Sequence, residues 1–147
     1  MGTSFSGFAK VDYQSLNAKQ REVHNFHFIA GVLASYGYAT YPVRDDWNGG
    51  DMFARHMLNG QSLLIQLKSR LTFDRKYQNK QLWIAFPDKD AVYVYPHDEV
   101  LAKYVEGRQG RSKPLDSSAS WMKDGIVHWP APTKELLELI QPYKLDV

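Results

Sequence analysis

The residues with the clearest capacity for chemistry are Asp51, Gln66 and Lys68, which occur in two apolar segments on either side of an Asn-Gly dipeptide. An aspartate, an amide and the backbone carbonyl of Leu67 offer the hard oxygen ligands that Mg²⁺ prefers. A bound metal would bridge a phosphate oxygen and lower the pKa of a water molecule, and a nearby lysine would steer that water or stabilise the phosphate charge. These residue types therefore favour metal-dependent hydrolysis of a phosphate ester, with Mg²⁺ or Mn²⁺ as the ion.

The dipeptide Asn59-Gly60 determines how these residues are placed. Asn-Gly is the strongest short signal for a two-residue hairpin turn, so the segments before and after it are expected to pair as antiparallel strands. That register puts Asp51 directly opposite Lys68. Because side chains alternate along a strand, Gln66 is expected on the same face, where a polar group inside an apolar strand needs a partner or a function.

A helix is expected to begin after Asn17, because Gln20 three residues later completes a capping box, and to end near Gly37. Apolar residues recur along it at helical spacing, at positions 23, 26, 29, 30, 33 and 34. Glu22 falls within this apolar stripe at 100° per residue. We therefore expect its carboxylate to face the sheet or a cleft beside it.

The remaining elements complete one domain. Strands are expected at 40–43, 82–86 and 91–95, helices at 97–105 and after Thr133, a polar connector at 72–80, and loops at 45–50 and 106–120. This order predicts an α/β (α+β) fold with a mixed central sheet of about five strands and flanking helices. Residues 1–147 are expected to form a single domain, with its core at about 17–105 and a C-terminal loop and helix at 106–147.

The composition sets limits on function. A chain of 147 residues with 44% hydrophobic and 23% charged residues is typical of one packed domain. It contains no cysteine, which excludes disulfides, zinc–cysteine sites and a thiol nucleophile. It has neither a signal-peptide-like start nor an apolar run of about 18 residues, so a cytoplasmic location without membrane contact is expected.

The basic residues are unevenly distributed, although the net charge is only +2. Segment 68–80 carries five basic residues against one aspartate, with Phe73 and Tyr77 between them, and segment 103–113 carries four against one glutamate. Basic and aromatic residues beside a metal site suit a phosphate backbone. The residues expected to contact DNA are Arg70, Arg75, Lys76, Lys80, Arg108, Arg111 and Lys113.

The spacing of these residues over positions 17–70 resembles the PD-(D/E)XK nuclease superfamily, in which a helix with a glutamate precedes a hairpin with an aspartate and an (E/D/Q)-x-K motif. The resemblance implies a restriction-endonuclease-like fold, as in restriction enzymes and archaeal Holliday junction resolvases, and Mg²⁺-dependent hydrolysis of DNA. It assigns catalytic roles to Asp51, Gln66, Lys68 and Glu22, and metal ligation to Asp51, Gln66 and the Leu67 carbonyl. Two positions depart from the family pattern: Gly50 stands where the proline would be, and Gln66 replaces a carboxylate by a neutral amide.

The same residues allow other interpretations. Asp51 and Lys68 can form a plain cross-strand ion pair, Gln66 can be a satisfied core amide, and Glu22 can lie on the helix surface. A catalytically inactive nucleic-acid-binding module on the same fold is one alternative function. A protein-interaction domain that docks through Trp47, Trp121 and Trp129 is another. Analogy with endonucleases that cut two strands leaves a homodimer open.

Overall fold

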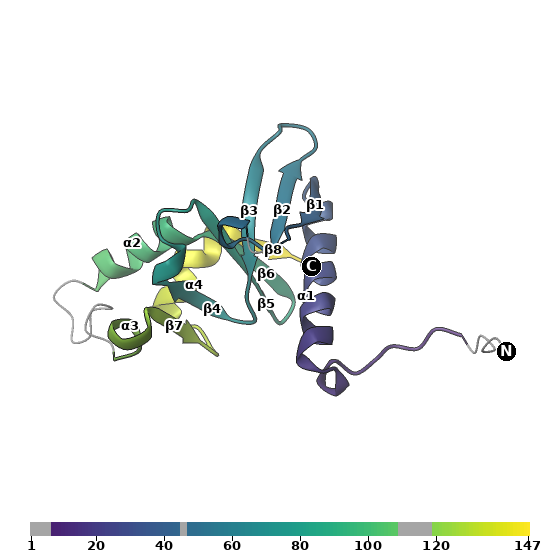
Figure 1. Cartoon of the computed structure of the whole chain (residues 1–147), viewed down its shortest axis with the longest axis horizontal. Helices are drawn as coiled ribbons and strands as arrows, with labels where there is room; N and C mark the ends of the chain where they lie inside the picture. Colours follow the sequence, from purple (N-terminus) through teal and green to yellow (C-terminus); the bar gives the residue numbers. More distant parts are fainter. Residues whose placement is uncertain (1–6, 45–46, 109–118) are drawn as a thin grey trace.

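The computed structural model describes residues 7–44, 47–108 and 119–147. A six-stranded mixed sheet has the order β1-β2-β3-β5-β6-β8, and β4 and β7 form a separate two-stranded sheet (Figure 1). The strands are β1 (Tyr38–Pro42), β2 (Met52–His56), β3 (Ser62–Leu67), β4 (Leu71–Asp74), β5 (Leu82–Asp88), β6 (Ala91–Pro96), β7 (Ile126–Trp129) and β8 (Lys144–Asp146). The helices are α1 (Ala18–Ser35), α2 (His97–Gly107), α3 (Ala119–Asp124) and α4 (Lys134–Ile140), with 3₁₀ turns η1 (Tyr13–Ser15), η2 (Trp47–Gly49), η3 (Arg75–Tyr77) and η5 (Gln141–Tyr143). The predicted mixed α/β class is thereby confirmed.

Helix α1 begins where the sequence predicts. The Asn17 side chain accepts a hydrogen bond from the Gln20 N–H at 2.8 Å, and the Gln20 side chain accepts one from the Asn17 N–H at 3.0 Å. This reciprocal capping box satisfies two backbone donors at the start of the helix. Gly37, with φ of +89°, follows its end in the left-handed conformation that glycine adopts without a steric penalty.

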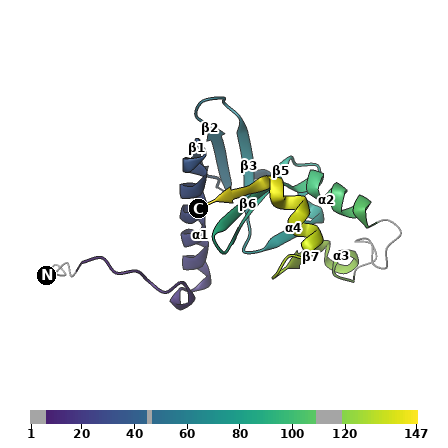
Figure 2. The same ribbon diagram turned by 180° about the vertical axis from the view of Figure 1, so that it is seen from behind.

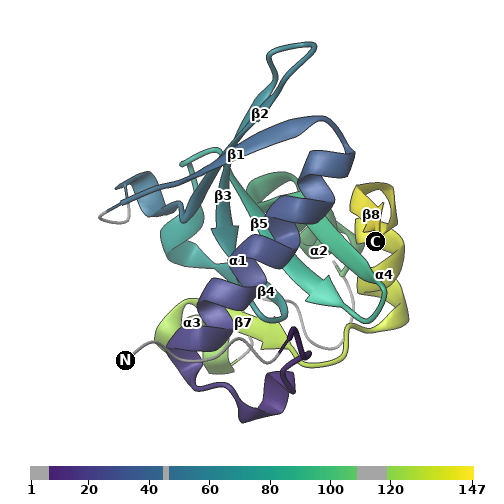
Figure 3. The same ribbon diagram turned by 90° about the vertical axis from the view of Figure 1, so that its right-hand side faces the viewer.

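The two faces of the large sheet are covered differently. Helix α1 packs on one face, where Ile29, Val32 and Leu33 meet Met52 and Ile65. The other face is covered by α2, α4 and the β4–β7 sheet, whose buried residues include Leu71, Phe73, Tyr95, Val100, Leu136 and Ile140. Figure 2 shows α4 and β8 from behind, and Figure 3 shows α1 running across its face of the sheet while the β2–β3 hairpin projects beyond the rest of the molecule.

The predicted hairpin exists, but its register differs from the prediction by two residues. Arg55 pairs with Ser62, and the His56 N–H donates to the Gln61 carbonyl at 2.7 Å, so the loop spans 57–60 rather than two residues. A two-residue type I′ turn requires positive φ at both central positions, whereas in this loop only Gly60 has it, at +74°. The wider loop is stabilised by the His56 ring, whose Nδ1 accepts from two loop N–H groups at 3.2 Å each.

The prediction of a polar connector at 72–80 is wrong for residues 72–74. All four residues of β4 are buried, and β4 pairs with β7, which was not expected as a strand. The predicted closing helix is confirmed as α4, with Thr133 as its N-cap. Most of the expected loop 106–120 lies outside the described residues. None of the helices in the described part of the chain is long and apolar enough to span a membrane.

Candidate functional site

Asp51 precedes β2, and its carboxylate is fixed to the end of β3. Its Oδ2 accepts a hydrogen bond from the Leu67 N–H at 3.0 Å, and its own N–H donates to the Ile65 carbonyl at 2.8 Å. The neighbouring Gly50 is explained by packing, because a Cβ atom there would collide with the side chain of Leu64. Asp51 is thus held by two backbone contacts with β3 and cannot swing freely into solvent.

Lys68 follows β3 directly and lies on the same face as Gln66. Its N–H donates to the Ala85 carbonyl at 2.9 Å, and its Nζ lies 5.3 Å from the centroid of the Tyr77 ring. Burial lowers the pKa of Lys68, and the positive charge of Lys76 lowers it further, while the charges of Asp74 and Asp51 oppose the shift. A half-buried lysine with a lowered pKa beside two carboxylates is suited to proton transfer or to contact with an anion.

Lys76 and Asp74 extend this cluster from η3 and the end of β4. The Lys76 Nζ also lies 5.3 Å from the Tyr77 ring centroid, so two ammonium groups contact one aromatic ring. Asp74 is only 5% exposed, accepts from the Lys76 N–H at 3.0 Å, and lies 3.8 Å from the Lys76 Nζ. The sequence predicted a DNA-contacting role for Lys76 and placed Tyr77 among the basic residues, but it did not indicate that the Asp74 carboxylate is buried beside them.

The side-chain amide of Gln66 contacts the backbone of its own strand. The Gln66 Nε2 donates to the Leu67 carbonyl at 3.4 Å, which leaves the amide oxygen as its acceptor group. The Asp51 carboxylate, the Gln66 oxygen and the Leu67 carbonyl make a donor set with one negative charge. Within the described residues no three His, Asp or Glu side chains gather in a group that could hold a metal ion.

The two-residue difference in register preserves the predicted face. In the observed register Asp51 falls opposite Gln66 rather than opposite Lys68, because β2 pairs Met52 with Ile65. Side chains repeat every two residues along a strand, so a shift of two keeps all three on one side of the sheet. The structure therefore brings Asp51, Gln66 and Lys68 together on the face opposite α1.

The expected orientation of Glu22 is wrong. Its side chain is 70% exposed and forms an ion pair with Lys19 at 3.4 Å. The start of α1 extends past the strands of the sheet (Figure 1), so full burial begins only at Ile29, and even Val23 on the expected stripe is 50% exposed. Because α1 covers the face opposite to Lys68, the structure does not bring Glu22 to the site.

The predicted DNA-contacting residues are not all turned toward the Lys68 cluster. Arg75 donates to the Trp121 carbonyl at 2.6 Å, and Arg108 pairs with Glu135 at 3.1 Å. Lys80 is exposed and Arg70 is half-buried, while Arg111 and Lys113 lie outside the described residues. The alternative of an exposed tryptophan surface is wrong for Trp121, which is only 6% exposed, and Trp129 is half-buried. The side chain of Trp47 is not among the described side chains.

Side chains of β6 and α2 hold β4 in place. The Tyr95 Oη accepts from the Thr72 N–H at 3.1 Å and donates to the Thr72 carbonyl at 2.6 Å. The His97 Nε2 accepts from the Asp74 N–H at 2.9 Å, and its Nδ1 lies 2.8 Å from Oδ1 of Asp98. Burial lowers the pKa of His97, although Asp98 opposes this shift. The lowered pKa favours the neutral ring, which the acceptor role of Nε2 requires. These contacts fix the backbone of Asp74, and through it the position of the cluster.

Comparison with family models, with curated proteins and with solved structures finds no match for this chain.

Proposed function

We propose that this protein is a metal-dependent nuclease with a restriction-endonuclease-like fold that hydrolyses phosphodiester bonds in DNA in the cytoplasm. One observation carries the proposal: the Asp51 carboxylate, held by the Leu67 N–H, lies on the same sheet face as the half-buried Lys68. A helix followed by a hairpin in a mixed sheet supports the fold part of the proposal.

In this proposal a Mg²⁺ or Mn²⁺ ion is held weakly by three oxygen donors. Asp51, the Gln66 oxygen and the Leu67 carbonyl would hold it, since Mg²⁺ is commonly bound through one or two carboxylates, retained waters and substrate phosphates. When bound, the ion polarises a phosphate oxygen and lowers the pKa of a coordinated water. The neutral Gln66 leaves a single formal charge in the set, so affinity is expected to be lower than with a glutamate at this position.

The residues of the chain then position the phosphate and move protons. Hydrolysis joins a water oxygen to phosphorus and breaks one backbone phosphorus–oxygen bond, so the water loses a proton and the leaving oxygen gains one. Lys68 in its charged form stabilises the phosphate charge, and its lowered pKa makes the neutral form, which accepts the water proton, more accessible. Lys76, which also lies over the Tyr77 ring, adds a second cation for the phosphate backbone.

A second candidate is a binding module on the same fold that does not cut DNA. The exposed Glu22 and the neutral Gln66 favour it, because together they leave Asp51 as the single carboxylate among the predicted catalytic residues that remain at the site. The two candidates share the DNA-binding surface and differ in metal binding and cleavage.

The test compares wild type, Asp51→Asn and Gln66→Glu in plasmid cleavage and in calorimetric metal titrations, each with Mg²⁺ and Mn²⁺. We expect cleavage by wild type, a loss of about 100-fold or more in Asp51→Asn, and tighter metal binding with retained or increased cleavage in Gln66→Glu. Asp88→Asn, which changes an aspartate at the end of β5, is the matched control and should behave as wild type.

Two results would contradict the nuclease. If wild type and Gln66→Glu neither bind metal nor cleave DNA, the binding module is the better account. If Asp51→Asn cleaves as fast as wild type, the site has been assigned to the wrong residues.

A further inference from the structure

The sheet face that carries Asp51 and Gln66 continues along the projecting hairpin as an ordered set of cross-strand rows. Residues directly opposite each other in antiparallel strands lie on the same face. The first row beyond Asp51 contains Tyr41, Phe53 and Leu64, and the next contains Ala39, Arg55 and Ser62. Successive rows are about 7 Å apart along the strands.

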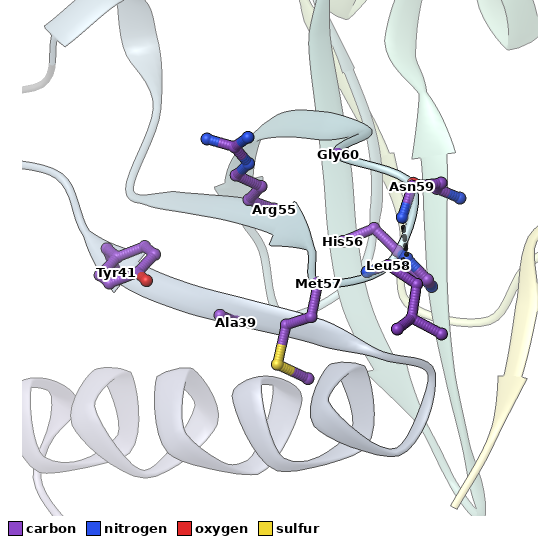
Figure 4. A pocket seen from close by; sticks show the side chains of 8 residues that line it. All are labelled: Ala39, Tyr41, Arg55, His56, Met57, Leu58, Asn59 and Gly60. Carbon is purple, nitrogen blue, oxygen red and sulfur yellow. Dashed lines mark hydrogen bonds between the residues drawn. The ribbon is translucent and has the colours of Figure 1, made fainter.

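This face of the hairpin is open to solvent, unlike the opposite face. Met52 and Ala54, which alternate with Phe53, are fully buried beneath α1. Tyr41 is 55% exposed, and Arg55 is also exposed. Figure 4 shows Arg55 projecting from β2 on the side away from the helix. The covering elements of this side pack over β5 and β6, and the hairpin extends beyond them (Figure 3).

An open hollow of about 520 Å³ lies at the far end of this face. Its lining includes Tyr41, Arg55 and the hairpin loop from His56 to Gly60 (Figure 4). Met57 and Leu58 in that loop are 65% and 91% exposed. The hollow is therefore bordered by an aromatic ring, a guanidinium group and apolar side chains.

The charged residues on this face indicate which kind of ligand it can bind. Along their described lengths β1, β2 and β3 carry no acidic residue, and Arg55 and His56 are their basic ones. At the other end of the face, Lys68 and Lys76 both lie over the Tyr77 ring. The exposed Tyr41 and the half-buried Phe53 lie between Arg55 and these lysines, and the Asp51 carboxylate on the same face is held by the Leu67 N–H. Aromatic rings beside basic groups bind single-stranded nucleic acid, because bases stack on the rings and basic groups follow the phosphates.

A protein strand is a less suitable occupant. β1 is an edge of the sheet, but it has five residues and ends in Pro42, which has no N–H to donate to an added strand. The exposed features lie on the face of β1 rather than along its edge. Bases in duplex DNA already stack on one another, so Tyr41 and Phe53 can receive only unpaired bases.

From this arrangement we infer that the Tyr41–Phe53 face binds an unpaired DNA strand next to the bond that is cut. The inference rests on the proposed function and names its substrate class: DNA that contains a single-stranded segment beside the Asp51–Lys68 site. Tyr41 and Phe53 stack on the bases, and Arg55 contacts a phosphate.

The test measures binding rather than cleavage, so that it stands apart from the nuclease proposal. Fluorescence anisotropy with the full chain in EDTA compares labelled oligo(dT), oligo(rU) and a duplex of the same length. Wild type should bind oligo(dT) more tightly than the duplex. Tyr41→Leu should weaken oligo(dT) binding about tenfold, whereas Tyr41→Phe, which keeps the ring, should bind as wild type. Arg55→Gln should reduce the slope of log affinity against log salt by about one.

Phe8→Leu is the matched control, because Phe8 is an exposed aromatic residue in the segment before α1 and should have no effect. Circular dichroism melting curves verify that the variants are folded. Unchanged oligo(dT) binding by Tyr41→Leu would overturn the inference, as would equal weakening of duplex binding or binding of oligo(rU) alone. Altered self-association of Tyr41→Leu in sedimentation, without DNA affinity in wild type, would identify a protein surface instead.

The outcomes separate the two proposals. If plasmid cleavage depends on Asp51 but oligo(dT) binding is insensitive to Tyr41, the nuclease stands and the stacking face is overturned. If no protein cleaves DNA but Tyr41→Leu selectively weakens oligo(dT) binding, the nuclease fails and the stacking face stands as part of a binding module.

Discussion

The two faces of the central sheet are built from different chemistry. On the α1 face every buried residue of the cluster is apolar, as in the contacts of Ile29 and Leu33 with Ile65. The buried polar residues of the described chain, Thr72, Asp74 and His97, all belong to the elements on the opposite face. Lys19 and Glu22 of α1 are exposed to water.

The difference explains where chemistry can take place. An apolar face is stabilised by burial alone and requires no precise partners. A face that buries a carboxylate and a lysine must supply hydrogen bonds and opposite charges, because isolated buried charges are costly. The Tyr95 and His97 contacts with β4 supply that support beside Lys68. We therefore expect substitutions on this face to affect activity, and equivalent substitutions on α1 to affect stability at most.

The largest expected effect separates two lysines on opposite faces. Lys68→Ala should lower plasmid cleavage about 100-fold or more, because Lys68 acts on the phosphate or on the attacking water. Metal binding should be retained, because Lys68 is not a ligand. Lys19→Ala on α1, where the lysine is largely exposed, should cleave as wild type. Cleavage that survives Lys68→Ala would show that the chemistry does not belong to this face.

The next effect concerns His97. His97→Phe leaves the buried Asp74 N–H without its acceptor, which should lower the free energy of unfolding by about 1–3 kcal/mol in urea titrations. Ile29→Val on the α1 face should cost about 0.5–1.5 kcal/mol. His97→Phe should also reduce cleavage, because Asp74 and Lys76 shift, whereas Ile29→Val should not. Equal cleavage by both variants would show that β4 does not position the site.

His97 also predicts a pH dependence. Its pKa is lowered by burial in the folded protein, so the unfolded chain binds the proton more readily. Stability is therefore complete above the unfolded pKa of about 6.5 and falls as the pH decreases below it toward the folded pKa. Urea midpoints measured across this range should fall in wild type and change less in His97→Phe. The same slope in both proteins would exclude His97 as its source.

The sequence predicts which residues share a face of the hairpin better than it predicts how the two strands pair. The Asn59-Gly60 signal led to a register that is wrong by two residues, yet the face of Asp51, Gln66 and Lys68 was correct because strand periodicity is two. A register shift of one residue would have placed these side chains on the opposite face. The local turn signal was therefore sufficient to predict which residues share a face, although it did not predict the cross-strand partner of Asp51.

The burial of β4 and the exposure of Glu22 depend on tertiary contacts, which a local sequence pattern cannot indicate. The segment that begins Thr72-Phe73-Asp74 looks like a polar connector, but its backbone is satisfied by Tyr95 and His97 from elements far along the chain. Helical periodicity indicates which side of a helix is apolar, but not which turns reach beyond the sheet. Glu22 lies in such a turn, and its position along α1 rather than its angle decides its exposure.

The smallest expected effect is that of Glu22→Gln, and it tests the comparison most directly. Glu22 is exposed, pairs with exposed Lys19, and belongs to the helix on the far face. Exposed pairs of this kind contribute little, so the free energy of unfolding should change by less than about 0.5 kcal/mol. Cleavage rates and metal titrations should match wild type, whereas Asp51→Asn should lose cleavage. A large loss of cleavage in folded Glu22→Gln would contradict this division of the faces, because the carboxylate would then have to reach the substrate from α1.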